Sequence, residues 1–274
     1  MARGTIRKPA VAGRFYPSDP VELQEMVDRY IKQAEVTAAP DRAACIVAPH
    51  AGYVYSGPTA GFVYARILGK QPGRVILLGC SHRYPIETAS VFTRGAFETP
   101  VGCFPVDEEF ADRIAEETES TTVEPHLLEH ALEVQLPFLK AAVGEVPIVP
   151  ILFGSPPGRW HAEIGQRIAS MVGDDDLVIA STDLSHYMTE EQAHRKDKQS
   201  IDALLSKDWA VYTSGVATGA CSMCGSPAVV AAMAYALARG AEEWTLLDYR
   251  TSADASGDHE RVVGYAAVTM EHPA

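Results

Sequence analysis

Short, continuously apolar runs alternate along this chain with segments of helical periodicity. Loop residues bound the runs, which is typical of strands buried on both faces in a parallel sheet covered by helices. The predicted strands are Ala44–Ala48, Val75–Leu78, Val146–Phe153, Leu177–Ala180 and Gly264–Met270.

Helices are predicted between these strands. Ser18 and Asp19 form an N-cap before Pro20, and Gly240 follows an Ala-rich helix, as expected for helix ends. The predicted helices are Pro20–Ala34, Thr59–Leu68, Asp107–Glu117, Glu129–Val143, His161–Val172, Glu190–Leu205 and Pro227–Arg239.

Two segments depart from this alternation. Ala89–Phe104 places Gly95, Pro100 and Gly102 among β-formers, which predicts a hairpin that decorates the sheet. Thr251–Glu260 is polar and rich in small residues, which predicts a mobile surface loop. We find no internal repeat and no long linker, so the prediction is a single αβα sandwich domain over residues 1–274, with a mainly parallel central sheet and a small β-hairpin addition.

Charge, apolar runs and cysteine count limit the kinds of partner and cellular location that we expect. The formal net charge of −13 argues against a nucleic-acid or anionic-membrane partner, because both repel an acidic chain. No stretch approaches the ~18 apolar residues of a membrane span, and the charged start lacks the apolar run of a signal peptide. The five cysteines are an odd number in a long chain, which favours reduced thiols and a cytoplasmic location.

The candidate chemistry gathers where strands end. His50, His82 and His186 each follow a predicted strand, and an aromatic residue comes soon after each of them. Ligands of open α/β sheets bind at the carboxyl ends of the strands, and neighbouring strands lie ~5 Å apart, so these imidazoles can meet at one ion. The alternative is three unrelated, hydrogen-bonded histidines at the rim of the sheet.

Cys224 is the fourth candidate, because it precedes the helix that begins near Pro227. Backbone N–H groups and the helix dipole favour a thiolate there, the form that binds metal. Cys221 stands three residues earlier, but without a second Cys pair a four-cysteine zinc site is excluded. The alternative is a buried structural cysteine.

Two further pairs are candidates for supporting roles. His130 and Glu133 lie in the predicted helix and are expected to orient a ligand histidine through its other ring nitrogen, or else to form a surface pair. Asp183 is expected to raise the basicity of His186 and make it a general acid–base, or else to cap the helix at Glu190.

Aromatic residues beside glycines supply candidate pocket walls. Phe15 follows Gly13, and Tyr53 and Tyr55 follow Gly52. They are expected to wall a pocket for a flat or phenolic ligand, or to anchor their loops on the sheet.

Taken in order, several segments resemble the Memo family, whose prokaryotic members are often named AmmeMemoRadiSam system protein B. The resemblance runs from about residue 7 to about residue 270 and rests on an ordered set of segments. They are AVAGRFYPSDP, APHAGYVYSGPTAGFVY, LLGCSHRY, FETPVGCFPVD, EHALEVQLPFL, STDLSHY and CGSP.

The resemblance implies a fold similar to class III extradiol dioxygenases, which hold non-haem iron with two His and one carboxylate. In Memo proteins the matching ligands are His, His and Cys, here His50, His82 and Cys224, and the acid–base histidine of the dioxygenases is matched by His186. Thiolate is softer than carboxylate, so one transition metal ion is expected, with iron or copper favoured and zinc as an alternative.

The animal family member is described as an adaptor that binds phosphotyrosine peptides in this cleft, where Phe15 and either Tyr55 or Tyr53 match its contact positions. Phe15 stands where the animal form has Trp. The prokaryotic group name implies AMMECR-type and radical SAM proteins as partners.

Three functions follow as hypotheses. The first is a metal-dependent redox enzyme, or a dioxygenase-like protein, acting on a small aromatic substrate with His186 moving protons. The second is a non-catalytic peptide- or protein-binding module with a vestigial metal site. The third is thiol hydrolysis with Cys224 as the nucleophile.

Overall fold

The computed structural model describes residues 5–120, 122–154 and 156–274. Its main sheet runs in the order β10-β11-β2-β8-β3-β7-β4, with β9 paired to β11. The four central strands β2, β8, β3 and β7 are parallel, whereas β10, β11 and β4 run antiparallel at the edges. The strands are β2 (Ala43–Ala48), β3 (Val75–Cys80), β4 (Ala89–Val91), β7 (Ile148–Phe153), β8 (Leu177–Ser181), β9 (His186–Met188), β10 (Glu243–Thr251) and β11 (Val262–Glu271).

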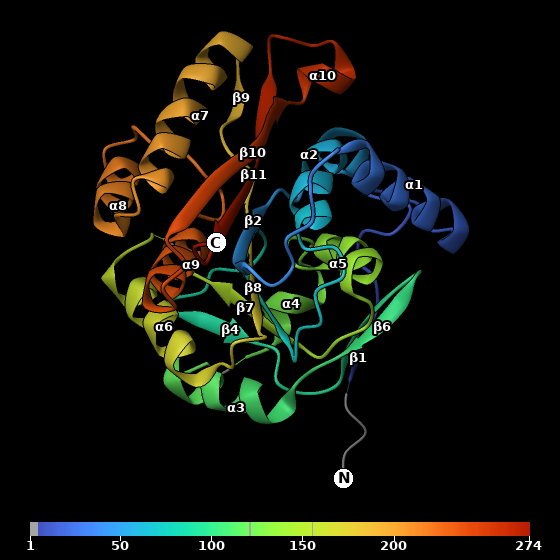
Figure 1. The fold of residues 1–274 in the computed structure, drawn as a ribbon, viewed down its shortest axis with the longest axis vertical. Helices are drawn as coiled ribbons and strands as arrows, with labels where there is room; N and C mark the ends of the chain where they lie inside the picture. The colour runs from blue at the N-terminus through green and yellow to red at the C-terminus, as the bar shows by residue number, and fades with distance from the viewer. Residues whose placement is uncertain (1–4, 121, 155) are drawn as a thin grey trace.

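Helices cover both faces of this sheet, which confirms the αβα sandwich (Figure 1). One face carries α6, α7, α8 and α9, and the other carries α1, α2 and α5. The helices are α1 (Pro20–Gln33), α2 (Tyr53–Arg66), α3 (Glu108–Glu117), α4 (Glu124–Leu127), α5 (Leu136–Val143), α6 (Arg159–Met171), α7 (Glu190–Leu205), α8 (Trp209–Ala217), α9 (Ser226–Ala238) and α10 (Ala253–Ser256), with a 3₁₀ turn at Glu133–Gln135. None of the helices in the described part of the chain combines the length and apolarity of a membrane span.

Helix α9 is the innermost helix and contacts all four parallel strands. Its alanines let it lie close to the sheet and to α6. A Cβ placed on Gly165 of α6 would fall 2.0 Å from the carbonyl oxygen of Ala231, so this crossing requires glycine. The loop before α9 is thereby held over the carboxyl ends of the strands.

The segment predicted as a hairpin divides between two sheets. Strands β5 (Ala96–Thr99) and β6 (Gly102–Pro105) form the antiparallel hairpin, and β1 (Ile6–Arg7) adds to it in parallel. The first part of the segment is β4, which instead extends the main sheet beside β7.

Several predicted boundaries were wrong. Helix α2 begins at Tyr53 and contains Pro58, whereas the predicted helix began only at Thr59. Residues 129–132 are not helical, so α5 begins only at Leu136. Helix α8 and strand β10 were not predicted, and Ala253–Ser256 forms a short helix within the segment predicted to be a loop.

Candidate metal centre

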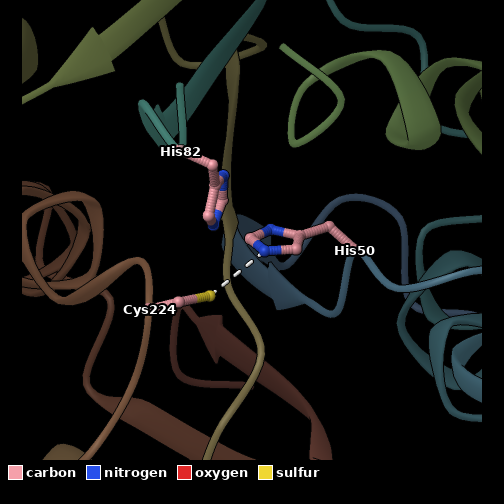
Figure 2. A group of neighbouring side chains, drawn as sticks. All are labelled: His50, His82 and Cys224. Carbon is pink, nitrogen blue, oxygen red and sulfur yellow. Dashed lines mark hydrogen bonds between the residues drawn. The ribbon is translucent and has the colours of Figure 1, made fainter. Parts of the chain in front are cut away.

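Three side chains from distant parts of the chain converge above the sheet (Figure 2). His50 follows β2, His82 follows β3, and Cys224 lies in the loop before α9. Strand β8 lies between β2 and β3, so the two histidines flank its carboxyl end. One ligand atom from each residue lies within 4.8 Å of the other two, and the His50 and His82 ring centroids are 5.0 Å apart.

The hydrogen bonds around His50 fix which nitrogen faces the cleft. Its Nδ1 lies 3.0 Å from Ser181 Oγ, and that hydroxyl already donates its proton to the carbonyl of Ala131 at 2.6 Å. Ser181 must therefore accept from His50 Nδ1–H, which leaves a lone pair on Nε2. Burial, with His130 and His82 nearby, holds the pKa of His50 well below its usual value, so the ring is neutral and ready to bind a cation.

Cys224 presents its sulfur to that lone pair. Sγ lies 3.1 Å from His50 Nε2 and accepts the backbone N–H of Asp183 at 3.2 Å. Burial and the nearby Asp183 carboxylate raise the pKa of Cys224 well above its usual value. Burial and the Asp183 charge therefore outweigh the effect of the helix start, which was expected to favour a thiolate. Cys224 is a thiol that donates its proton to His50 Nε2. A cation bound here would displace the thiol proton.

Cys221 takes no part in this cluster. Its Sγ lies 3.7 Å from the carbonyl oxygen of Gln199, whereas Cys224 faces His50. The Cys-x-x-Cys spacing therefore does not place the two sulfurs at one site.

Glu129 was not among the predicted residues, yet it contacts both His82 and His130. Its Oε1 lies 3.0 Å from each ring's Nδ1, and the three residues form a second group able to hold a cation. Burial opposes the charge, but the hydrogen bonds from His130 and His82 outweigh it and hold the pKa of Glu129 far below its usual value. Sequence reasoning missed this residue because its partner His82 lies 47 positions away.

Glu133 does not orient a histidine, contrary to expectation. Its carboxylate accepts from the Arg7 guanidinium, the Tyr16 hydroxyl and the backbone N–H groups of Ala10 and Val11. The reason is local: the chain turns at residues 129–132 instead of continuing as a helix, so Glu133 faces the N-terminal segment. The predicted contact with a ligand histidine belongs to Glu129.

Asp183 and His186 occupy separate positions. Asp183 Oδ1 accepts the backbone N–H of His50 at 2.7 Å, and burial raises the pKa of Asp183. His186 lies on β9, where its Nδ1 is 2.9 Å from the carbonyl of Leu184 and therefore carries the proton. The carboxylate thus supports the His50 loop, while the bond from Nδ1 leaves Nε2 of a neutral His186 ring as an acceptor.

The three predicted aromatic residues differ in their surroundings. The Phe15 ring lies 4.9 Å from that of His130, so it borders the cluster. Tyr55 is 43% exposed. Tyr53 is buried, and its hydroxyl donates to the carbonyl of Val134, so it supports the core and does not wall a pocket.

Comparisons with known proteins identify the family of this chain. The model of the family described as Memo-like protein matches residues 7–269. A MEMO1 family protein from Methanopyrus kandleri is 37% identical over 279 residues, covering 96% of this chain and 98% of the relative. A MEMO1 family protein from Desulfurococcus amylolyticus is 38% identical with the same coverage of each chain, and one from Aquifex aeolicus is 35% identical over 95% of this chain and 97% of the relative.

A solved structure shares the fold. An uncharacterized protein from Escherichia coli K12 superimposes with a TM-score of 0.52 at 13% identity, over 83% of this chain and 100% of that chain. Identity this low shows similarity of fold alone.

Proposed function

Because the chain belongs to the Memo-like protein family, we propose that its cleft binds one transition metal ion through His50, His82 and Cys224 and serves metal-dependent redox chemistry on a small aromatic substrate. The observation that carries the metal site is the convergence of two imidazoles and one thiol within 4.8 Å. The match over residues 7–269 supports one Memo-like domain spanning residues 1–274.

The donor set fits a soft or borderline ion. Thiolate and imidazole together suit iron, copper and zinc, and disfavour calcium and magnesium, which prefer oxygen. Among the described residues, this group supplies three protein ligands, which leaves positions for a substrate. When bound, a redox-active ion would supply electron transfer and oxygen chemistry.

The chain's own residues support that chemistry. Ser181 directs the His50 lone pair into the cleft, and the Asp183 backbone N–H holds the sulfur. Phe15 contributes an apolar wall next to His130. His186 Nε2 is the proton carrier in this proposal, because its other nitrogen is committed to Leu184.

Metal titration under anaerobic, reducing conditions tests the proposal. We expect the wild-type protein to bind about one equivalent of Fe(II) or Cu(I), with Zn(II) as a comparison. His50→Ala and Cys224→Ser should each abolish tight binding, whereas Cys221→Ser should not, because that sulfur faces Gln199. Metal content unchanged in His50→Ala and Cys224→Ser would refute the assignment.

A peptide- or protein-binding module is the second candidate, and an exposed aromatic rim favours it. Tyr187 is 67% exposed, adopts a φ of 60°, and carries the Arg261 guanidinium 5.4 Å from its ring centroid. Burial, the Asp183 carboxylate and the two rim residues Tyr55 and Tyr187 raise the pKa of the buried Tyr265. Non-glycine residues at positive φ concentrate at binding sites.

Partner capture separates the two candidates. If the protein is a binding module, the immobilised protein should retain a partner equally well with and without metal. Tyr187→Ala should abolish that retention. AMMECR-type and radical SAM proteins are the proposed partners, and the cytoplasm the proposed location. Substrate turnover that depends on His186 would favour the enzyme instead.

A further inference from the structure

The Glu129 carboxylate lies between the imidazole rings of His82 and His130. The third ring of the cluster, His50, is held by Ser181 instead. Glu129 Oε1 lies 3.0 Å from His82 Nδ1 and 3.0 Å from His130 Nδ1. The same oxygen accepts the backbone N–H groups of His130 at 2.8 Å and Ala131 at 3.0 Å, while Oε2 accepts that of His82 at 2.6 Å. The residue is only 3% exposed, so water does not compete for these oxygens.

This arrangement determines the protonation of both rings. Three backbone N–H groups surround the carboxylate, so it acts as an acceptor only. A neutral His82 ring must then carry its proton on Nδ1 to donate to Oε1. His130 Nδ1 lies 3.0 Å from the same acceptor, and this close approach favours a proton on its Nδ1 as well. Both rings consequently keep a lone pair on Nε2.

The two Nε2 atoms have different surroundings. His82 joins His50 and Cys224 in the candidate metal group, whereas His130 does not belong to that group. The His130 ring lies 4.7 Å from that of His82, 5.3 Å from that of His50 and 4.9 Å from that of Phe15. Its side chain is 16% exposed, and no described residue donates to its Nε2. That lone pair is therefore available to a ligand beside the ion.

We propose that Glu129 is a positioning residue that holds His82 and His130 in the same tautomer for two different tasks. His82 Nε2 binds the cation, and His130 Nε2 accepts a hydrogen bond from an O–H or N–H group of the cleft ligand. The cation part of this proposal rests on the proposed function; the tautomer part rests only on the contacts above. Glu129 here has the role that was expected of Glu133.

The tautomers are measured in the wild-type protein, and histidine variants serve only to assign the signals. Long-range ¹H–¹⁵N correlation on protein labelled at histidine distinguishes Nδ1–H from Nε2–H rings, with His82→Ala and His130→Ala used to assign the signals. In the neutral rings, we expect both to be Nδ1–H. An Nε2–H ring at either position would overturn the proposal, and this holds even if variants at Glu129 fail to fold.

Glu129→Gln then tests the consequence for binding. One end of the amide becomes a donor, so the side chain no longer accepts at both oxygens. We expect metal affinity to fall about 10- to 100-fold and the His82 and His130 signals to redistribute between tautomers. Glu190→Gln is the matched control, because it removes a carboxylate 2.6 Å from His259 on the surface. It should leave the metal affinity and both cleft tautomers unchanged.

The outcomes distinguish this proposal from the metal site itself. If His50→Ala and Cys224→Ser abolish metal binding while Glu129→Gln alters neither affinity nor tautomers, Glu129 has no positioning role although the metal site stands. If the wild-type protein binds no metal, the proposed function fails, while the tautomer measurement still decides the role of Glu129. A second equivalent of metal that disappears in His130→Ala would show that His82, Glu129 and His130 form a cation site, and would overturn the positioning role.

Discussion

Ser181 Oγ lies 3.0 Å from His50 Nδ1 and gives its only proton to the carbonyl of Ala131. The hydroxyl also accepts from the Gln135 side chain at 2.9 Å. One buried serine on β8 thus joins the candidate metal ligand to the turn that carries Glu129 and His130. The position of the His50 ring depends on this hydroxyl, which contacts Nδ1 and leaves Nε2 facing Cys224.

Ser181→Ala should therefore weaken metal binding without removing a ligand. The His50 ring loses the acceptor for Nδ1–H, and Gln135 loses an acceptor as well, so we expect metal affinity to fall about tenfold or more and the free energy of unfolding to fall by about 1–3 kcal/mol. Calorimetric metal titration and urea unfolding measure the two effects. Unchanged affinity in a folded variant would show that Ser181 does not orient His50.

Much of this framework was predictable because it follows from local patterns. The parallel strands β2, β3, β7 and β8 are buried along their whole length, so each appears as an apolar run. Strand β10 was missed because it lies at the sheet edge and mixes polar with apolar residues, as in Glu243–Thr251. The start of α2 was missed because Pro58 is accommodated inside the helix.

The site was predictable only in part, because only some of its residues stand in a recognisable local pattern. His50, His82 and Cys224 stand next to strand ends or a helix start, and the structure brings them together. Glu129 and Ser181 act on residues 47 and 131 positions away, so no local pattern shows their contacts. The turn at residues 129–132 forms because the Glu129 carboxylate binds the N–H groups of His130 and Ala131, which removes them from a helix.

The buried Arg7–Glu133 pair should be important for stability. Both side chains are fully buried, and Arg7 also donates from Nε to the carbonyl of His126. Arg7→Leu leaves the Glu133 charge unpaired, so we expect the free energy of unfolding to fall by about 3–5 kcal/mol. Lys8→Ala removes the adjacent but exposed pair with Glu98, and should change it by less than about 1 kcal/mol. Urea unfolding of both variants measures the two changes in the free energy of unfolding. Similar losses in Arg7→Leu and Lys8→Ala would contradict the importance of the buried pair.

Acid should destabilise the protein through His126. Burial lowers the pKa of His126 from 6.5 to about 4, whereas the unfolded chain keeps the ordinary value. Between these values the unfolded state binds a proton that the folded state does not, so stability falls as the pH drops from 6.5 to about 4, by roughly 3 kcal/mol in total. His126→Gln should flatten this part of the pH profile in urea unfolding. A profile as steep as that of the wild type would assign the effect to other groups.

A buried hydroxyl offers a stabilising substitution. Thr269 Oγ1 lies inside strand β11, and no described residue bonds to it. Thr269→Val removes an unsatisfied polar atom and keeps the shape, so we expect the free energy of unfolding to rise by about 1 kcal/mol. Thermal unfolding provides the measurement. A loss of stability would indicate that a bound water satisfies this hydroxyl.

The five thiols should differ strongly in their reaction with iodoacetamide. Cys103 is exposed, whereas Cys45, Cys80 and Cys221 are buried, and burial together with the Asp183 carboxylate raises the pKa of Cys224. Since the thiolate is the reactive form, we expect Cys224 near neutral pH to react on the order of a hundredfold more slowly than Cys103. Mass spectrometry of timed samples resolves the sites, and Cys103→Ser removes the fast phase as a control. Rapid labelling of Cys224 would contradict the raised pKa and favour the thiol-hydrolase hypothesis, because the His50 lone pair, 3.1 Å away, would then be acting as its base.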